Sequence, residues 1–592
     1  MSNAIALAQL LEELPDTALA RALAHTKGTL HHVHDVFDAV DLLDADDAVD
    51  ARMTWLTRGQ VERLRELSDR NTFNTEDPVD RSLAEAVLVD AHGTPLDRVA
   101  QRVHALSAAH TPTAEQTPQT TPRSDDGDLR TALAEGYTTV RLIYGLLVGV
   151  GNRPPQVLAK GGIGRSHRAT LAGFLSVDSD QLPLLLTLAE SARLLAKTSQ
   201  QIALPTPEAH AWMLASDAQR LTDLTAGFLA RLPRALSQAV RDALLTGASP
   251  WWQQVEDALP FATAVLAEYR APVAECARAL GLTTDTATTP AAALLLAPGG
   301  QAREDLETFA PGTVDYFYPQ ADASVIAPGR LRADIDQRLL QFSRCVRFGD
   351  ASTYVLTAET VIHGLNDGMT AQEMLTFLDA HARGGTPQPL RYLITDSAEH
   401  FGQVRIRAEG RGTRISASSA AIATTLLHDR ELTALGLIPV SEAPTDLLSP
   451  FPPETTFNAL SEAHYPVASG GRPSGSVTFL PSGRPVGTLL PWPGTGDPST
   501  EALAVAQSLH RSVEGGDADL RAGQIAHILE FAVKRRVPVR IRVARPGAAE
   551  GSFNVEPTGI GGGRLRGRDP QAQTERTFPL SSILAVDVID EH

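Results

Sequence analysis

With 592 residues, the chain is too long for one hydrophobic core, and this length predicts about three to five domains. The net charge of −18 excludes a protein coated in nucleic acid, because phosphate binding depends on clustered Lys and Arg, but it permits a local contact. The two cysteines offer no disulfide framework and no four-ligand zinc site. The sequence has no long apolar run and no signal-peptide pattern, so we expect a cytoplasmic protein without membrane contact.

The N-terminal part of the chain predicts helices. Residues 1–107 place apolar side chains such as Leu10 and Leu14 at helical spacing, which indicates a small helical, winged-helix-like domain. Residues 108–128 contain repeated Thr-Pro steps and very few apolar side chains, so they predict a disordered linker.

Residues 129–232 predict three helices followed by a short extended pair, which is the order of a winged helix-turn-helix. The helix expected to read a DNA groove begins with Asp178, Ser179 and Asp180 and continues as an apolar run, so its exposed end is acidic. This pattern leaves protein contact or core packing and DNA contact open as alternatives. The residues of this unit that we expect as secondary phosphate contacts are Arg165, His167, Arg168 and Lys197.

Residues 233–305 predict a further helical segment, in which Trp251 and Trp252 are packing residues rather than a base-stacking platform, since no basic residues surround them. Residues 306–465 alternate extended and helical stretches and predict an α+β domain. One of its helices opens with the capping-box spacing of Thr370–Glu373.

The C-terminal part begins with a Pro- and Gly-rich connector and a helix, residues 466–515. Residues 516–592 then predict one helix followed by four or five short alternating strands with Gly and Pro turns, which is typical of a small SH3- or Sm-like β-barrel. The predicted fold class is therefore multidomain α+β, with N-terminal helical and winged-helix units, an α+β domain and a C-terminal barrel.

Basic residues cluster in this C-terminal segment. From Arg521 to Leu580 there are eleven Lys and Arg against five Asp and Glu. Alternate residues of a strand share one face, so the spacing predicts arginines on common faces of two strands. A solvated outer face and a phosphate-binding face explain this spacing equally well. The further arginine Arg576 favours a local anion site. These nucleic-acid or anion-binding candidates are Arg540, Arg542, Arg564, Arg566, Arg568 and Arg576.

Motifs for catalysis, cofactors or metals are missing from the sequence. The nucleotide-binding pattern G-x-x-x-x-G-K-[ST] does not occur, and the nearest stretch, Lys160–Ser166, has its glycines and lysine in the wrong order. No G-x-S-x-G nucleophile elbow occurs either. We therefore expect no catalytic residue, no cofactor and no metal. A cluster that we interpret as a solvated helix start rather than a metal site consists of His31, His32, His34 and Asp35.

The segment from about Gly312 to Val440 resembles the XPB-like helicase N-terminal domain, also called the helicase-associated domain of actinobacterial proteins. The matching stretches are VDYFYPQADASVIAPG, TYVLTAETVIHGLNDGMTAQEMLTFLDAHARGGTPQPLRYLITDSAEHFGQVRI and ALGLIPVSEAPTDLL. The winged segment, with PPQVLAKGGIGRSHRATLAGFL and LPTPEAHAW, is similar to the unit that precedes this domain in the family. The resemblance implies a module that accompanies, but does not constitute, an ATP-driven motor.

The C-terminal strands resemble a WYL domain, with VPVRIRV, VEPTGI, GGRLRGRD and ERTFPLSSILAVDV in the family order. Leu565, Arg566 and Gly567 stand where the family has its Trp-Tyr-Leu stretch. WYL domains sense nucleotides or single-stranded nucleic acid through a basic, aromatic pocket, and the resemblance assigns Arg576 to the arginine of the family's R-T-F step.

Together these observations predict a non-catalytic, DNA-associated accessory or regulatory factor of DNA repair or transcription, related to helicases but without their motor. It would bind DNA weakly and in a salt-sensitive way, with a separate helicase, ATPase or polymerase subunit as a further partner. The alternative is a protein-binding adaptor that docks such a motor or polymerase without contacting DNA.

Overall fold

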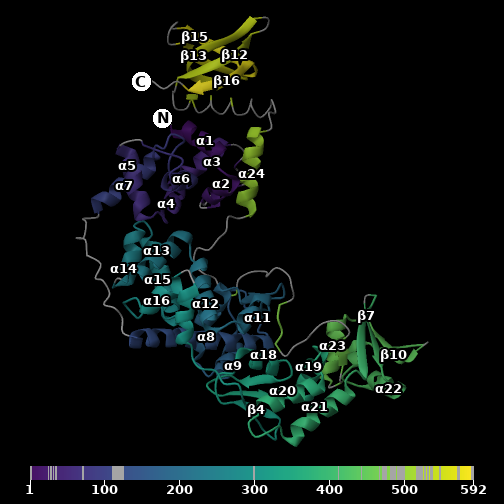
Figure 1. Ribbon diagram of the computed structural model, residues 1–592. Helices are drawn as coiled ribbons and strands as arrows, with labels where there is room; N and C mark the ends of the chain where they lie inside the picture. The colour runs from purple at the N-terminus through teal and green to yellow at the C-terminus, as the bar shows by residue number, and fades with distance from the viewer. Residues whose placement is uncertain are drawn as a thin grey trace. The chain divides into compact units, whose positions relative to one another are not determined.

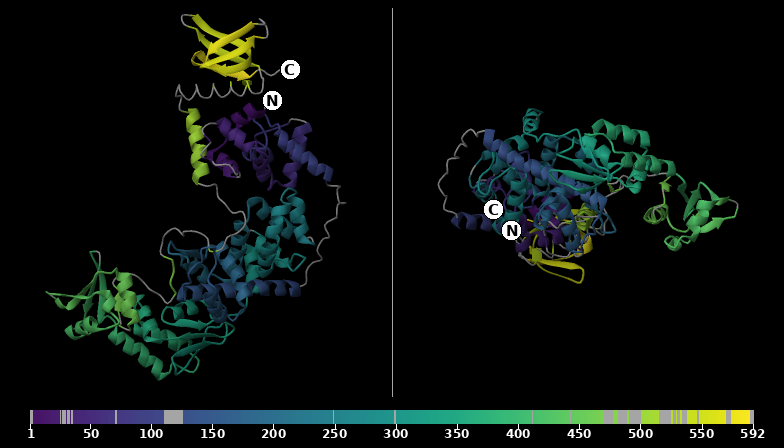
Figure 2. Two further views of the ribbon diagram at one scale, coloured as in Figure 1. Left: turned by 180° about the vertical axis from the view of Figure 1, so that it is seen from behind. Right: turned by 90° about the horizontal axis from the view of Figure 1, so that it is seen from below.

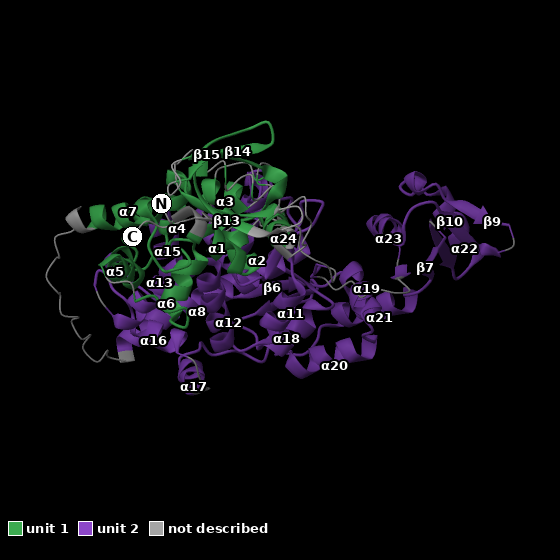
Figure 3. Ribbon diagram, turned by 90° about the horizontal axis from the view of Figure 1, so that it is seen from above, with its two compact units in different colours: residues 1–117, 255–267, 494–592 green, residues 118–254, 268–493 purple. Residues whose placement is uncertain are grey.

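The computed structural model describes residues 3–24, 26, 30, 33, 36–69, 72–109, 126–247, 249–297, 300–410, 412–441, 443–463, 465, 467–469, 477–480, 489, 500–514, 525, 529, 532–533, 538–545, 548–569 and 574–588. They fold into two compact units (Figure 3). Unit 1 contains residues 1–117, 255–267 and 494–592, and unit 2 contains residues 118–254 and 268–493. Most of the predicted linker, the histidine cluster at 31–35 and most of the predicted helix at 525–535 lie outside the described residues.

Unit 1 begins with a helical core that a distant segment of the chain completes. The helix α24 (Thr500–Glu514) packs on α2, and two views show it beside the N-terminal helices (Figure 1, Figure 2). Its side chains Ala502, Ala506 and Leu509 are buried in the same cluster as Leu7 and Leu19. The N-terminal helices are α1 (Asn3–Glu13), α2 (Asp16–Ala24), α3 (Val36–Leu43), α4 (Asp46–Met53), α5 (Arg58–Asp69), α6 (Pro78–Glu85) and α7 (Asp97–Ala109).

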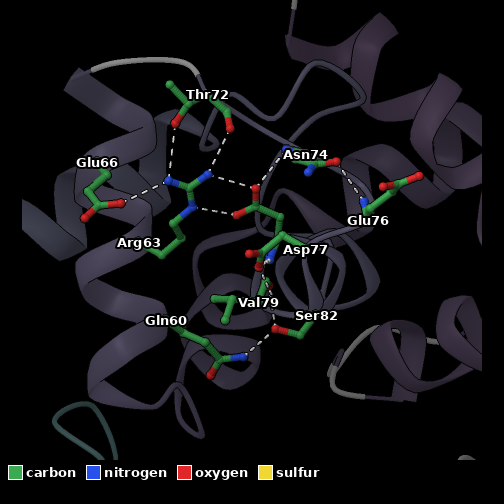
Figure 4. Close-up of polar contacts among 10 residues, drawn as sticks. Gln60, Arg63, Glu66, Thr72, Asn74, Glu76, Asp77, Val79 and Ser82 are labelled. Carbon is green, nitrogen blue, oxygen red and sulfur yellow. Dashed lines mark hydrogen bonds and ion pairs between the residues drawn. The ribbon is translucent and has the colours of Figure 1, made fainter.

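An ion pair joins α5 to α6 in this core (Figure 4). Arg63 donates from Nε and Nη2 to the two carboxylate oxygens of Asp80, at 2.7 and 2.9 Å, and the backbone N–H of Asn74 donates to the same carboxylate. The hydrogen bonds from Arg63 hold the pKa of Asp80 below its usual range. Asp80 is fully buried, and burial of an unpaired carboxylate would cost free energy of folding. The bidentate ion pair with Arg63 offsets that cost.

The C-terminal end of unit 1 is a five-stranded antiparallel sheet in the order β15-β14-β13-β12-β16. The prediction of a closed barrel was wrong: in the described residues β15 and β16 are the two edges and do not pair with each other. The long strand β13 shifts register between Pro557 and Gly559 and pairs with β12 along one half and with β14 along the other, so the sheet bends there, but no strand pairing among the described residues joins its two edges. The strands are β12 (Val539–Arg545), β13 (Ala548–Gly561), β14 (Arg564–Asp569), β15 (Thr574–Pro579) and β16 (Ile583–Val588).

Unit 2 begins with three helices and an antiparallel hairpin, in the order that the sequence predicts. A helical group follows, in which Trp251 and Trp252 are buried with their rings 5.3 Å apart. The first elements are α8 (Asp126–Asn152), α9 (Arg165–Leu175), α10 (Leu182–Ser191), β1 (Leu195–Lys197) and β2 (Ala203–Pro205). The helical group is α11 (Pro207–Leu214), α12 (Asp217–Arg231), α13 (Arg234–Thr246), α14 (Trp251–Ala258), α15 (Thr263–Ala279), α16 (Pro290–Leu296) and α17 (Gly300–Thr308), of which the end of α14 and the start of α15, residues 255–267, belong to unit 1.

A four-stranded antiparallel sheet follows in the order β3-β4-β6-β5, accompanied by four helices. The predicted capping box of α20 is confirmed, since the Thr370 N–H donates to Glu373 at 2.8 Å and the Glu373 N–H donates back to Thr370 Oγ1 at 3.2 Å. The strands are β3 (Tyr318–Pro319), β4 (Ser324–Ala327), β5 (Arg344–Arg347) and β6 (Ser352–Val355). The helices are α18 (Ala333–Leu340), α19 (Ala358–Asn366), α20 (Ala371–His381) and α21 (Gln388–His400).

A second sheet ends unit 2, in the order β11-β7-β8-β10-β9, with α22 (Ala420–His428) and α23 (Pro453–Glu462) packed against it. Its strands are β7 (Val404–Glu409), β8 (Gly412–Ala417), β9 (Ile438–Val440), β10 (Ala443–Ser449) and β11 (Val467–Ser469). A mixed α+β architecture is therefore present. Among the described residues, no helix has both the length and the apolar character needed to span a bilayer.

Gly567 is required where β14 passes β13. A Cβ atom at this position would lie 2.2 Å from Val555 Cγ1 and 2.8 Å from the Glu556 carbonyl oxygen. We expect Gly567→Ala to lower the stability of this sheet by about 1 to 3 kcal/mol, because the strands must separate to accept the methyl group. Calorimetry of the full chain measures the loss. The matched control is Gly559→Ala, where nothing lies within 4 Å, and equal transitions for the two variants would contradict the packing described.

Candidate functional site

The arginines predicted on the C-terminal strands are exposed. Arg540 and Arg542 alternate with the buried residues of β12, and Arg564, Arg566 and Arg568 alternate with the buried residues of β14. The two sets therefore project away from the hydrophobic core of the sheet, as the period of a strand requires.

The strand β13 separates these two sets and shows that they diverge. Arg542 lies opposite Ser552 near the start of β13, whereas Arg564 lies opposite Gly561 at its end. Arg542 is therefore farther than Arg540 from the arginines of β14. The two sets come nearest at Arg540 and Arg568, which lie opposite Asn554 and Glu556, and their other members lie progressively farther apart.

Two of the six candidates are engaged with acidic neighbours. Arg568 lies between Glu556 on one neighbouring strand and Glu575 on the other, so its charge is flanked by carboxylates. Arg576 pairs with Asp569 at 3.2 Å and stacks on the Phe553 ring, 5.1 Å from its centroid.

Arg576 also faces the other side of the sheet. It lies opposite Gly567 in a register that places Leu565 opposite the buried Phe578, so its side chain shares the inner face with those residues. The six arginines thus divide into a β12 pair, a β14 set and one inner residue.

The secondary candidates of unit 2 lie on α9 and on the hairpin. Arg165 is exposed, His167 and Arg168 are half-buried, and Lys197 is half-buried at the end of β1. The turn before α10 is exposed and carries Asp178 and Asp180, as the sequence predicts, while most of α10 is buried. The exposed residues at the start of α10 therefore repel a phosphate backbone.

Sequence reasoning missed a cleft in unit 2 of about 570 Å³. Its wall contains Arg141 from α8, Arg220 from α12, and Arg330 and Arg332 from the segment that enters α18. These residues come from stretches far apart in the sequence, so no local pattern reveals them. The one available signal is that Arg141 and Tyr144 interrupt the apolar face of a long helix at helical spacing.

Asp217 connects two of these arginines. Its carboxylate accepts from Arg220 at 3.0 Å and from Arg330 at 2.7 Å, and it begins α12, whose cap is Ser216. Arg220 also donates to the carbonyl oxygens of Trp212 and Met213. Burial lowers the pKa of Arg330, Asp217 opposes that shift, and the positive charges of Arg220 and Arg141 add to it. Three guanidinium groups therefore lie close enough to repel one another.

Asp336 lies at the inner wall of the cleft and is buried. It accepts hydrogen bonds from the hydroxyl groups of Tyr144 on α8 and Tyr354 on β6. Burial raises the pKa of Asp336, although the two hydroxyl donors and the charge of Arg220 act in the opposite direction. Burial likewise raises the pKa of the Cys345 thiol nearby, so this cysteine is not an activated nucleophile. Among the described residues, no group of His, Cys, Asp and Glu is arranged to hold a metal ion.

Residues 317–441 match the helicase conserved C-terminal domain family. The match runs from the residue before β3 to the residue after β9, so it includes Arg330, Asp336 and Tyr354 of the cleft but not Arg141 or Arg220. The chain therefore carries a helicase-related region, and this part of the sequence prediction is confirmed. No curated protein matches the chain. The finer XPB-like and WYL resemblances stay predictions.

The helicase-related region provides a pH-dependent prediction. Because burial raises the folded-state pKa of Asp336 above its ordinary value of 3.8, the folded state binds this proton more tightly than the unfolded state does. Its stabilising contribution is present below that value and is lost as the pH rises through the folded pKa. Between pH 3.8 and the folded-state pKa, the free energy of unfolding of the wild type falls by up to about 1.4 kcal/mol per pH unit, whereas that of Asp336→Asn does not. We therefore expect Asp336→Asn to become more stable than the wild type as the pH rises through this range.

Hydrogen exchange of the β6 amides between pH 4 and 8 measures this difference locally, which is appropriate in a chain of two units. Asp336→Ala is the control that removes both hydrogen bonds, and it should be destabilised at every pH. A difference between Asp336→Asn and wild type that stays constant over the range would show that Asp336 does not titrate as described.

Proposed function

We propose that this chain is a non-catalytic, nucleic-acid-associated accessory factor related to helicases, acting in DNA repair or transcription. The observation that carries the proposal is the match of residues 317–441 to the helicase conserved C-terminal domain family. Helicases act on nucleic acid, and a module that accompanies them contacts the same substrate or the motor itself. The XPB-like resemblance of the same segment supports the accessory role.

The exposed arginines of the C-terminal sheet supply the proposed DNA contact. Arg540 and Arg542 project from β12, and Arg566 projects from β14 with Gly559 and Thr577 as its uncharged cross-strand neighbours. Guanidinium groups on a solvated face bind backbone phosphates through charge and release counterions, which makes the contact weak and sensitive to salt. We propose the three-helix and hairpin segment as a winged-helix unit that contacts protein, since the start of its α10 is acidic.

The DNA contact is tested by charge reversal. We expect Arg540→Glu, Arg542→Glu and Arg566→Glu together to weaken single- and double-stranded DNA binding at least tenfold and to reduce the slope of log K against log salt by roughly two to three. Filter-binding titrations at several salt concentrations give both quantities. A wild-type chain that binds no DNA at low salt would contradict the proposal.

The matched control carries the same change of charge on exposed helix arginines that form surface ion pairs, Arg58→Glu, Arg102→Glu and Arg278→Glu. Exposed pairs contribute little to stability, so this variant should remain folded. An equal loss of affinity in the control would mean that the net charge of the chain, rather than the C-terminal sheet, determines binding.

The proposed role requires no motor within these residues. We expect the purified chain to hydrolyse ATP no faster with DNA than without it, because the sequence lacks the glycine-rich loop and lysine that hold nucleotide phosphates. A coupled phosphate-release assay measures this, with a known DNA-dependent ATPase as positive control. DNA-stimulated hydrolysis above the blank would overturn the non-catalytic assignment.

The divergence of the C-terminal arginines favours a second candidate, the protein-binding adaptor. Several large apolar side chains of unit 2 are exposed, among them Tyr392 and Ile438, at 69% and 61%. Exposed aromatic and branched side chains on an acidic protein provide anchors for a partner such as a helicase or polymerase subunit. Capture of that partner that is unchanged by the three arginine substitutions, without DNA binding, would support the adaptor.

A further inference from the structure

The cleft of unit 2 differs from the rest of this acidic protein in its charge. Four arginines line it, namely Arg141, Arg220, Arg330 and Arg332, and the carboxylates that line it are Asp217, Glu307, Asp334 and Asp336. Three of the four carboxylates already have hydrogen-bond or ion-pair partners within the protein. Asp334 is held by Arg332, Asp336 by two tyrosine hydroxyls, and Asp217 by two arginines, while Glu307 is exposed to water.

The inner part of the cleft therefore contains more positive than negative charge. Arg220 and Arg330 share the carboxylate of Asp217, and Asp336 accepts from two tyrosine hydroxyls, so three inner arginines face two inner carboxylates. Asp217 is almost completely buried, and the side chains of Arg141 and Arg330 are only about one fifth exposed, at 20% and 18%. Like charges held together with little water are costly, and an anion bound among them would lower that cost.

The arginines of the cleft differ in how far their donors are already used. Arg220 has used its donors on carbonyl oxygens and on Asp217, so it contributes charge rather than contacts. The Nη1 of Arg141 is buried and has no hydrogen-bond acceptor among the described residues, and its ion pair with the fully exposed Asp350 spans 3.6 Å. Arg330 holds Asp217 through Nη2. A planar guanidinium group with unused donors is suited to a tetrahedral oxyanion.

The size and walls of the cleft indicate more than a lone ion. Its volume of about 570 Å³ is in the range of pockets that hold small organic ligands, roughly 300 to 1,000 Å³. The rings of Tyr144 and Phe348 line it as a stacked pair with centroids 6.0 Å apart. Gly312 and Gly349 leave backbone accessible at the wall. Both rings are buried and Arg220 lies over the Tyr144 ring, 5.0 Å from its centroid, so they form a packed wall and the open volume is what could hold the organic part of a small phosphate.

We propose that this cleft binds the phosphate group of a nucleotide, either free or as part of a nucleic acid strand, with Arg141 and Arg330 as the phosphate donors. The site is separate from the arginines of the C-terminal sheet, so it goes beyond the proposed DNA contact and stands without it. In this arrangement Arg220 and Asp217 position Arg330, and the remaining volume of the cleft receives the rest of the nucleotide.

The decisive variant is Arg141→Gln. The ion pair that this change removes reaches a fully exposed partner, so the variant should keep the fold of the wild type. Titration calorimetry of the full chain with pyrophosphate, adenosine monophosphate and a single-stranded DNA oligonucleotide should show a loss of affinity of about tenfold or more for the probes that bind. Asp350→Asn releases Arg141 from its partner and should change affinity in the opposite direction, by about two- to threefold.

The matched control is Arg344→Gln, which removes a similarly long surface ion pair, 3.5 Å to Glu359, outside the cleft and should leave affinity unchanged. Binding of the monophosphate that Arg141→Gln weakens assigns a free nucleotide to the cleft, and binding of the oligonucleotide alone that Arg141→Gln weakens assigns a strand. A wild-type chain that binds none of the three probes, or equal affinities for wild type and Arg141→Gln, would overturn the proposal. The Arg540, Arg542 and Arg566 variant should retain pyrophosphate binding, which separates this test from that of the C-terminal sheet.

Discussion

The buried carboxylate of Asp336 is the interaction on which the arrangement of unit 2 depends. It accepts hydroxyl groups from Tyr144 of a helix in the N-terminal part of the unit and from Tyr354 of the helicase-related sheet. A second link nearby joins Arg330 to Asp217 at the start of α12. A buried carboxyl group is costly unless its oxygens are hydrogen bonded, so the two parts are held in the one geometry that satisfies it. The cleft is a consequence of that geometry.

The sequence predicts those features that depend on neighbours in the chain. The capping box at Thr370 needs residues three apart, and its two hydrogen bonds are present. Closure of the C-terminal barrel depends instead on pairing between the first and last strands of the sheet, and in the described residues β15 and β16 stay unpaired where the alternating strands predict a barrel. The partnership of α24 with the N-terminal helices and the meeting of Arg141 with Arg330 are non-local for the same reason, so no local pattern indicates them.

Charge explains how an acidic protein related to helicases can approach a polyanion. The net charge of −18 opposes a broad nucleic-acid interface, and the arginines of β12 and β14 diverge rather than form one groove. Such a protein can still make local contacts with phosphate groups. A few exposed arginines attract a phosphate weakly, and half-buried arginines in a cleft attract it more strongly because water screens their charge less. Both modes are compatible with the proposed accessory role.

The most direct measurement is hydrogen exchange of the full chain with and without single-stranded DNA at low salt. The account predicts slower exchange in β12 and β14 of the C-terminal sheet, which disappears when the salt concentration is raised. If no described segment is protected by DNA at low salt, although the chain remains folded, the claim that this helicase-related protein contacts nucleic acid is contradicted.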